Sequence, residues 1–169
     1  REQKAGHYFR ACFDADGRLW LATPMGLFLV HRNSGRVVKK VAGLAGRQWP
    51  MGGICPDTMG NIWWFDRYLR RYDTRSGQVE TVMDGADTTG LLQQEGLLGI
   101  QVAGNAELWL LGWKTIVRYD PSSRKVLERM HLAIPPAAEK FYPRINRMVP
   151  EGDSVLWLTT TYGLVHLDL

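Results

Sequence analysis

The histidines are the first residues to test for chemistry, because they act as metal ligands and as acid–base groups. The sequence holds four: His7, His31, His131 and His166. No His-x-His or His-Glu pair stands at a spacing that binds a metal, and no Ser/His/Asp set can be assigned to one face. His31 and His166 fall in expected strands, where a histidine is ordinarily structural. We therefore predict no catalytic residue, no metal site and no cofactor.

The residues best suited to binding a ligand are aromatic and cationic, and they lie where the sequence does not repeat. Stretches such as "GHYFR", "GRQWP", "LGWKT", "KFYPRINR" and "TTTYG" carry them. Aromatic faces stack on sugar rings, and arginine forks bind carboxylates. If these loops meet on one face of the fold, they form a ligand-binding rim of Tyr8, Arg10, Trp49, Trp113, Lys114, Tyr142, Arg144, Arg147 and Tyr162.

A tryptophan repeat indicates the elements that must position this rim. The repeated tryptophans are Trp20, Trp63, Trp109 and Trp157, at separations of 43, 46 and 48 residues. A period in the forties is typical of propeller blades. The segments between them alternate polar and apolar residues with the period of two that strands show, and glycine or small polar turns separate them.

Each unit holds four expected strands, which predicts an all-β propeller with four-stranded antiparallel blades. We expect blades at about 7–42, 50–84, 97–131 and 144–169, the last without its outer strand. Such a partial ring leaves apolar faces open. Either further blades of a longer receptor chain or a second copy of this chain would close it.

The repeat gives structural roles to several residues that otherwise look chemical. A tryptophan at one fixed strand position fills the wedge between neighbouring blades. Asp14 and Asp57, each six residues before a tryptophan, are expected to cap the turn into the second strand. Cys12 and Cys55, each eight residues before a tryptophan, are expected to be buried thiols on the innermost strands of neighbouring blades, without a disulfide.

Composition restricts the partners. The net charge is +4 and the pI about 9.2, but no run of five or six like charges suggests nucleic-acid binding. No apolar stretch reaches the roughly 18 residues of a membrane span, and the first residues lack a signal-peptide core. We predict a globular segment with no nucleic-acid partner and no membrane contact of its own.

The run "DADGRLWLATPMGLFLVHRNSG" resembles the two-component regulator propeller repeat, which pairs an Asp-x-x-Gly turn with Leu-Trp-Ile-Gly-Thr and a following Gly-Leu. The second unit keeps the turn and ends on a Tyr-Asp-x-x-x-Gly turn, and the third and fourth units keep parts of the pattern. The matching residues in the first two units are Asp14, Gly17, Leu19, Trp20, Thr23, Gly26, Leu27, Asp57, Gly60, Trp63, Tyr72, Asp73 and Gly77.

In that family such repeats build the periplasmic sensor portion of hybrid histidine kinases, which often detect oligosaccharides. The resemblance therefore implies a non-catalytic, extracytoplasmic ligand sensor from a bacterium, with any kinase outside this chain. Two alternatives stay open. Streptogramin lyases are propellers with similar repeats, and a propeller can also serve as a protein-binding scaffold.

Overall fold

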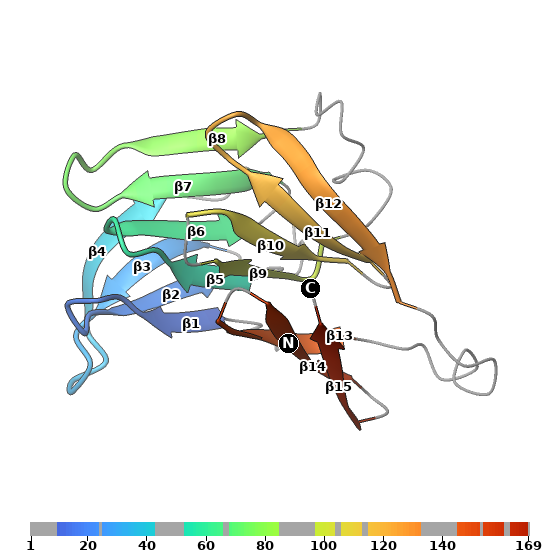
Figure 1. Cartoon of the computed structure of the whole chain (residues 1–169). Coiled ribbons are helices and arrows are strands. Elements are labelled where there is room, and N and C mark those ends of the chain that lie inside the picture. Colours follow the sequence, from blue (N-terminus) through green and yellow to red (C-terminus); the bar gives the residue numbers. More distant parts are fainter. Residues whose placement is uncertain are drawn as a thin grey trace, which may run out of the picture.

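The computed structural model describes residues 10–23, 25–42, 53–65, 68–84, 97–103, 106–112, 115–132, 145–152, 154–160 and 163–168, and their regular structure is all β-strand. Figure 1 shows four antiparallel sheets that follow one another along the chain. No helix of the described residues is long and apolar enough to cross a membrane.

Each sheet is a meander in which consecutive strands pair. The first contains β1 (Arg10–Phe13), β2 (Leu19–Thr23), β3 (Gly26–Val30) and β4 (Val37–Ala42). The second contains β5 (Gly53–Pro56), β6 (Asn61–Phe65), β7 (Leu69–Asp73) and β8 (Val79–Met83). The third contains β9 (Gly99–Val102), β10 (Leu108–Leu111), β11 (Thr115–Asp120) and β12 (Lys125–His131). The fourth contains β13 (Ile145–Glu151), β14 (Val155–Thr160) and β15 (Gly163–Asp168).

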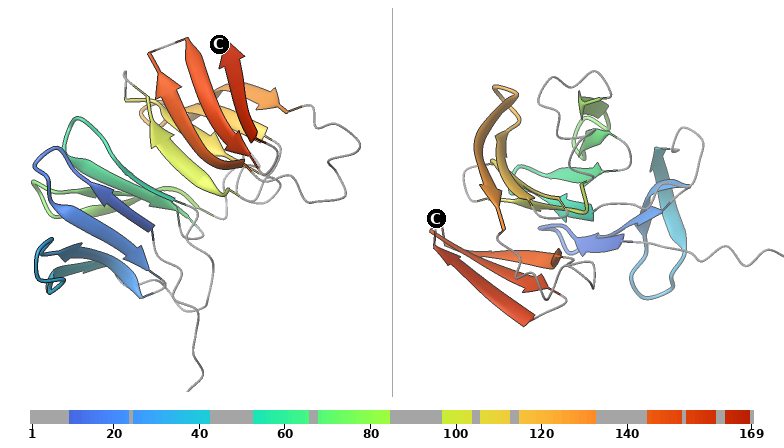
Figure 2. Two further views of the ribbon diagram at one scale, coloured as in Figure 1. Left: turned by 90° about the horizontal axis from the view of Figure 1, so that it is seen from below. Right: turned by 90° about the vertical axis from the view of Figure 1, so that its right-hand side faces the viewer.

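These sheets are the blades of a propeller, which confirms the predicted fold class. Their first strands contact one another in the order β1, β5, β9, β13, and the views in Figure 2 show the sheets fanning out from this inner edge. Among the described residues the fourth blade has three strands, so the expected lack of its outer strand also holds there.

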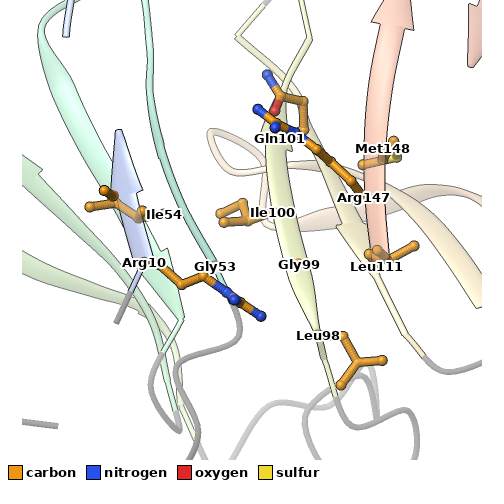
Figure 3. Close-up of a pocket in the computed structure, with 11 residues that line it drawn as sticks. Arg10, Gly53, Ile54, Leu98, Gly99, Ile100, Gln101, Leu111, Arg147 and Met148 are labelled. Carbon is orange, nitrogen blue, oxygen red and sulfur yellow. The ribbon is translucent and has the colours of Figure 1, made fainter. Parts of the chain in front are cut away.

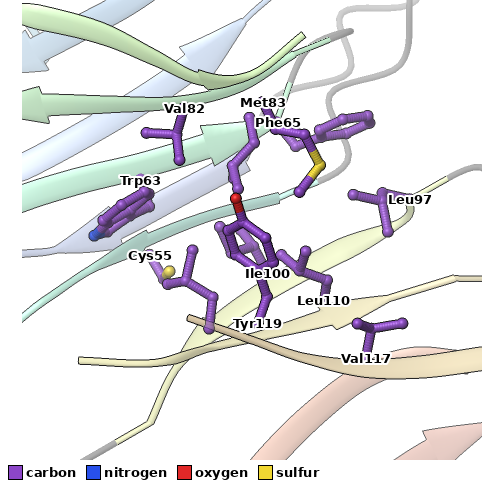
Figure 4. Packing of buried hydrophobic residues seen from close by; sticks show 12 residues of the cluster. Cys55, Trp63, Phe65, Val82, Met83, Leu97, Ile100, Leu110, Val117 and Tyr119 are labelled. Atoms are coloured by element: carbon purple, nitrogen blue, oxygen red, sulfur yellow. The ribbon is translucent and has the colours of Figure 1, made fainter. Parts of the chain in front are cut away.

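Three of the repeated tryptophans fill the wedges between blades, as predicted. Trp20 and Trp63 are 2% exposed and Trp109 is 3% exposed. Each tryptophan, with the side chains beside it on the same face, packs against the opposite face of the next blade, which is mainly aliphatic but also carries Trp64, Tyr72 and Tyr119. We call these the tryptophan face and the aliphatic face of a blade. In Figure 4, Trp63 and Met83 of the second blade meet Leu110 and Tyr119 of the third.

Among the described residues, the two end blades leave one face of each kind uncovered. On the fourth blade the tryptophan face carries Val149, 48% exposed, and Leu164, 63% exposed, beside a half-buried Trp157. On the first blade the aliphatic face carries Phe13, 58% exposed, beside a half-buried Leu21. On the inner blades the equivalents of Leu164 and Leu21 are buried, namely Leu69, Ile116, Trp64 and Leu110.

The first aspartate of each early unit does more than cap its turn. Asp14 Oδ1 accepts the backbone N–H groups of Asp16 (3.1 Å) and Arg18 (2.9 Å). Its Oδ2 accepts the indole N–H of Trp20 at 2.7 Å. Asp57 repeats the arrangement with Trp63 at 2.8 Å. One carboxylate thus shapes the turn and also fixes the ring that fills the wedge.

The same turn shows where glycine is required. Gly17 and Gly60, three residues before their tryptophans, have φ of 71° and 90°. In the third unit Ala106 takes this place with φ of 67°, a left-handed conformation that disfavours a side chain. That unit also lacks the aspartate, and has Ala103 at that position.

Candidate functional site: an axial pocket between the inner strands

A pocket of about 280 Å³ opens between the first strands of the four blades (Figure 3). All four inner strands contribute to its wall, together with Leu98 before β9 and Leu111 of β10. The residues that line it are Arg10, Ala11, Gly53, Ile54, Leu98, Gly99, Ile100, Gln101, Leu111, Arg147 and Met148.

Two glycines let the inner strands approach closely. A Cβ on Gly53 would lie 2.8 Å from the backbone nitrogen of Ile100, which leaves no room for any side chain. A Cβ on Gly99 would lie 3.2 Å from the Leu111 side chain. Packing therefore accounts for glycine at this level of the second and third blades.

The first and fourth blades carry an arginine at the same place. Arg10 pairs with Ala22 in the sheet register, and Arg147 pairs with Thr159. Both partners stand two residues after the repeated tryptophan, as do the partners of Gly53 and Gly99. The four blades thus present Arg, Gly, Gly and Arg at one repeat position. The long side chains of Arg10 and Arg147 therefore extend beside the part of the pocket wall where Gly53 and Gly99 have no side chain.

The pocket is cationic. In Figure 3 the Arg10 side chain reaches from β1 past Gly53 toward β9, and the Arg147 side chain reaches from β13 toward β9 and Gln101. Both arginines are exposed. Within the described part of the chain neither has an ion-pair or hydrogen-bond partner, and no carboxylate lines the pocket. The Arg147 guanidinium beside the Gln101 amide can receive an oxyanion, and the Arg10 guanidinium offers a second cationic group elsewhere in the same pocket.

Arg10 and Arg147 are the members of the predicted rim that the structure brings together. They lie in β1 and β13 and line the axial pocket, whereas we expected them in loops leading into those strands. The other predicted rim residues lie outside the described residues: Tyr8, Trp49, Trp113, Lys114, Tyr142, Arg144 and Tyr162.

Gln101 was not predicted as a site residue, although the sequence held a signal for it. It stands eight residues before Trp109, at the position that Cys12 and Cys55 occupy in the first two units. A polar amide at a position otherwise held by small or apolar side chains marks a departure from the repeat. The lining role of Gly53 and Gly99 was also missed. It becomes visible only when the four units are compared at the position ten residues before the repeated tryptophan.

The cysteines lie on neighbouring inner strands, as predicted, and both are free thiols. Burial, together with the nearby Asp14 carboxylate, raises the pKa of Cys12 to about 12. Full burial, followed by the nearby Cys12 and Asp57, raises the pKa of Cys55 well above its usual value. Both thiols stay protonated at neutral pH, which fits a packing role and not a nucleophilic one.

The described histidines sit at separate places with local contacts. The ring of His31 lies 3.0 Å from the Ser34 hydroxyl, and that of His131 lies 3.2 Å from the Thr115 hydroxyl. His166 meets the edge of Trp157 at 4.7 Å between ring centroids. In the part of the chain that the structure describes, no three His, Cys, Asp or Glu side chains gather as a metal site would need.

Comparison with known proteins gives a likeness in structure alone. No family model matches the chain, and no curated protein matches it in sequence. The extracellular domain of a hybrid two-component system from B. thetaiotaomicron matches 96% of this chain with a TM-score of 0.66 and 18% identity. A streptogramin B lyase matches 94% of it with a TM-score of 0.69 and 16% identity.

A catalytically inactive virginiamycin B lyase from Staphylococcus aureus, solved with quinupristin, matches 99% of the chain with a TM-score of 0.66 and 12% identity. This chain spans 22% of the sensor domain, 50% of the streptogramin B lyase and 58% of the virginiamycin B lyase. At these identities the likeness shows the propeller fold, which sensors and lyases share.

Proposed function

We propose that this chain is a non-catalytic, ligand-sensing propeller segment of an extracytoplasmic bacterial two-component sensor, and that its ligands are oligosaccharides. The observation that carries the proposal is the pair of arginines in the axial pocket, which have no side-chain partner among the described residues and stand at a position where the inner blades have glycine. Both arginines are exposed and line the pocket, and neither forms an ion pair among the described residues.

Two further points support a sensor. The structural likeness includes the extracellular domain of a two-component system over nearly the whole of this chain. The sequence also resembles the propeller repeat of such sensors. In this proposal, ligand binding changes how the blades pack against neighbouring domains, and a kinase outside this chain reads that change.

A binding screen tests the proposal directly. The purified chain is mixed with a panel of neutral and acidic oligosaccharides, and its thermal unfolding is followed. We expect at least one oligosaccharide to raise the melting temperature in a saturable way, because a ligand that binds only the folded state stabilises it. If no member of a broad panel shifts the melting temperature, oligosaccharide sensing is wrong.

The lyase remains the second candidate function, because the streptogramin B lyase shares the fold. The test incubates the chain with a type B streptogramin and a divalent metal and follows the antibiotic by liquid chromatography. We expect the antibiotic peak to stay unchanged. Conversion that depends on the chain would favour the lyase over the sensor.

A further inference from the structure

The axial pocket combines features that select a chemical class of ligand. Among the described residues that line it, the polar side chains are those of Arg10, Arg147 and Gln101, and the other lining side chains are apolar or absent. A concave site with cations and no carboxylate in its wall concentrates positive potential. Such a site attracts anions and disfavours cations.

We propose that the axial pocket is an anion site, in which Arg10 and Arg147 receive carboxylate or sulfate groups of an acidic saccharide. This inference rests on the proposed function, which it deepens by naming the ligand class. The two arginines reach into the pocket from the first and fourth blades, Arg147 beside Gln101 and Arg10 toward Gly99, so an acidic saccharide with more than one anionic group would contact both ends of the blade series.

The repeat shows that these arginines are not part of the scaffold. At the same level a Cβ on Gly53 would lie 2.8 Å from the backbone of β9, and a Cβ on Gly99 would lie 3.2 Å from the Leu111 side chain of its own blade. The arginines satisfy no comparable requirement. Three other arginines of the described chain, Arg18, Arg71 and Arg118, each pair with a carboxylate.

The geometry also suits an oxyanion better than a neutral group. A guanidinium presents a planar fork of N–H donors that matches carboxylate or sulfate oxygens, and such charge-assisted bonds are about twice as strong as neutral ones. Gln101 adds an amide that can donate to a further oxygen or accept a hydroxyl. Ile54, Ile100 and Met148 supply apolar wall for the body of the ligand.

The first experiment uses inorganic sulfate as the probe, so its result does not depend on the identity of the saccharide. Sodium sulfate is titrated into the full chain against sodium chloride of equal ionic strength, while the arginine Nε–H signals are followed by NMR. We expect the Arg10 and Arg147 signals to shift in a saturable way. Arg32 and Arg36, exposed near the β3–β4 turn, serve as internal controls.

The second experiment measures a charged and a neutral probe of one shape by calorimetry, trigalacturonate and its methyl ester. We expect the acid to bind at least tenfold more tightly than the ester. Arg10→Met and Arg147→Met should each weaken acid binding by roughly tenfold to a hundredfold, because each removes charged hydrogen bonds. Arg36→Met is the matched control and should leave binding unchanged.

The two proposals fail in different ways. If the pocket arginines respond to sulfate no more than Arg32 and Arg36, or if ester and acid bind equally, the anion site is wrong while oligosaccharide sensing stands. If sulfate binds at Arg10 and Arg147 but no saccharide of the panel binds, the anion site stands and oligosaccharide sensing is wrong. Equal losses in Arg36→Met and Arg10→Met would also overturn the anion site.

Discussion

At the scale of the residue, one carboxylate links turn formation to blade packing. Asp14 accepts two backbone N–H groups, the Arg18 side chain and the indole of Trp20. Burial alone would raise the pKa of Asp14, but the hydrogen bonds from Trp20 and Arg18 and the Arg18 charge outweigh it and lower that pKa. The folded state therefore favours the ionised form.

This linkage fixes a pH dependence. Because the folded pKa of Asp14 lies below its unfolded value of about 3.8, its contribution to stability is complete above that value and is lost as the pH falls through the folded pKa. Asp14→Asn should lower the free energy of unfolding by about 1–3 kcal/mol at neutral pH, since Trp20 and Arg18 lose a charged acceptor. Urea titrations over a pH series should show this deficit shrinking at acid pH.

Asp16→Asn is the control for that measurement. Asp16 pairs with the same Arg18 at 2.9 Å, but its side chain is 70% exposed. An exposed ion pair contributes less than about 1 kcal/mol. A loss in Asp16→Asn equal to that in Asp14→Asn would contradict the role assigned to Asp14, as would an Asp14→Asn deficit that does not depend on pH.

At the scale of the element, the close packing around the inner strands β5 and β9 depends on the absence of a side chain at Gly53 and Gly99. Gly53 of β5 faces the backbone of β9, whereas Gly99 of β9 faces the flexible end and Cβ of Leu111 within its own blade. A backbone atom cannot move without shifting the strand, but a leucine side chain can turn. The two glycines therefore differ in how much they tolerate a methyl group.

Alanine substitution measures that difference. Gly53→Ala should destabilise the chain by about 1–3 kcal/mol, the usual cost of overpacking, because the strands must separate. Gly99→Ala should cost clearly less in the same urea titration, since Leu111 can yield. Neither glycine has a positive φ, so backbone strain does not confuse the comparison. Equal losses, or a larger loss at Gly99, would contradict the close approach of β5 to β9.

The elements also show what the sequence could predict and what it could not. Tryptophan spacing and period-two alternation predicted the blades, because both report which side chains must be buried. Arg10 and Arg147 were assigned to the loop rim because they are cations that do not belong to the repeated pattern. Strands β1 and β13 include these arginines because backbone pairing, not burial, sets where they begin.

A second limit concerns the direction of side chains. Trp64, next to the repeated Trp63, is fully buried on the aliphatic face of the second blade, where it packs against the Trp20 cluster. Sequence alignment on one tryptophan per unit gave it no role. The pocket could not be predicted from the sequence either, because it forms only when four inner strands from distant parts of the chain come together.

At the scale of the whole molecule, the three internal interfaces follow one rule, in which a tryptophan face packs on an aliphatic face. The uncovered faces of the first and fourth blades are one of each kind. Two tryptophan faces would not match, so self-association by this rule must run head to tail. Two copies arranged in this way would cover all four open faces.

We therefore expect the purified chain to form a two-copy assembly, measured by sedimentation velocity. Trp157→Glu on the tryptophan face and Leu21→Glu on the aliphatic face should each shift the chain toward monomer, because each places a charge in an apolar interface. Mixing the two variants should recover dimer, because one intact tryptophan face and one intact aliphatic face then remain. Lys125→Glu, at an exposed position on the outer strand β12, is the control and should leave the assembly unchanged. A monomeric wild-type chain would contradict self-closure.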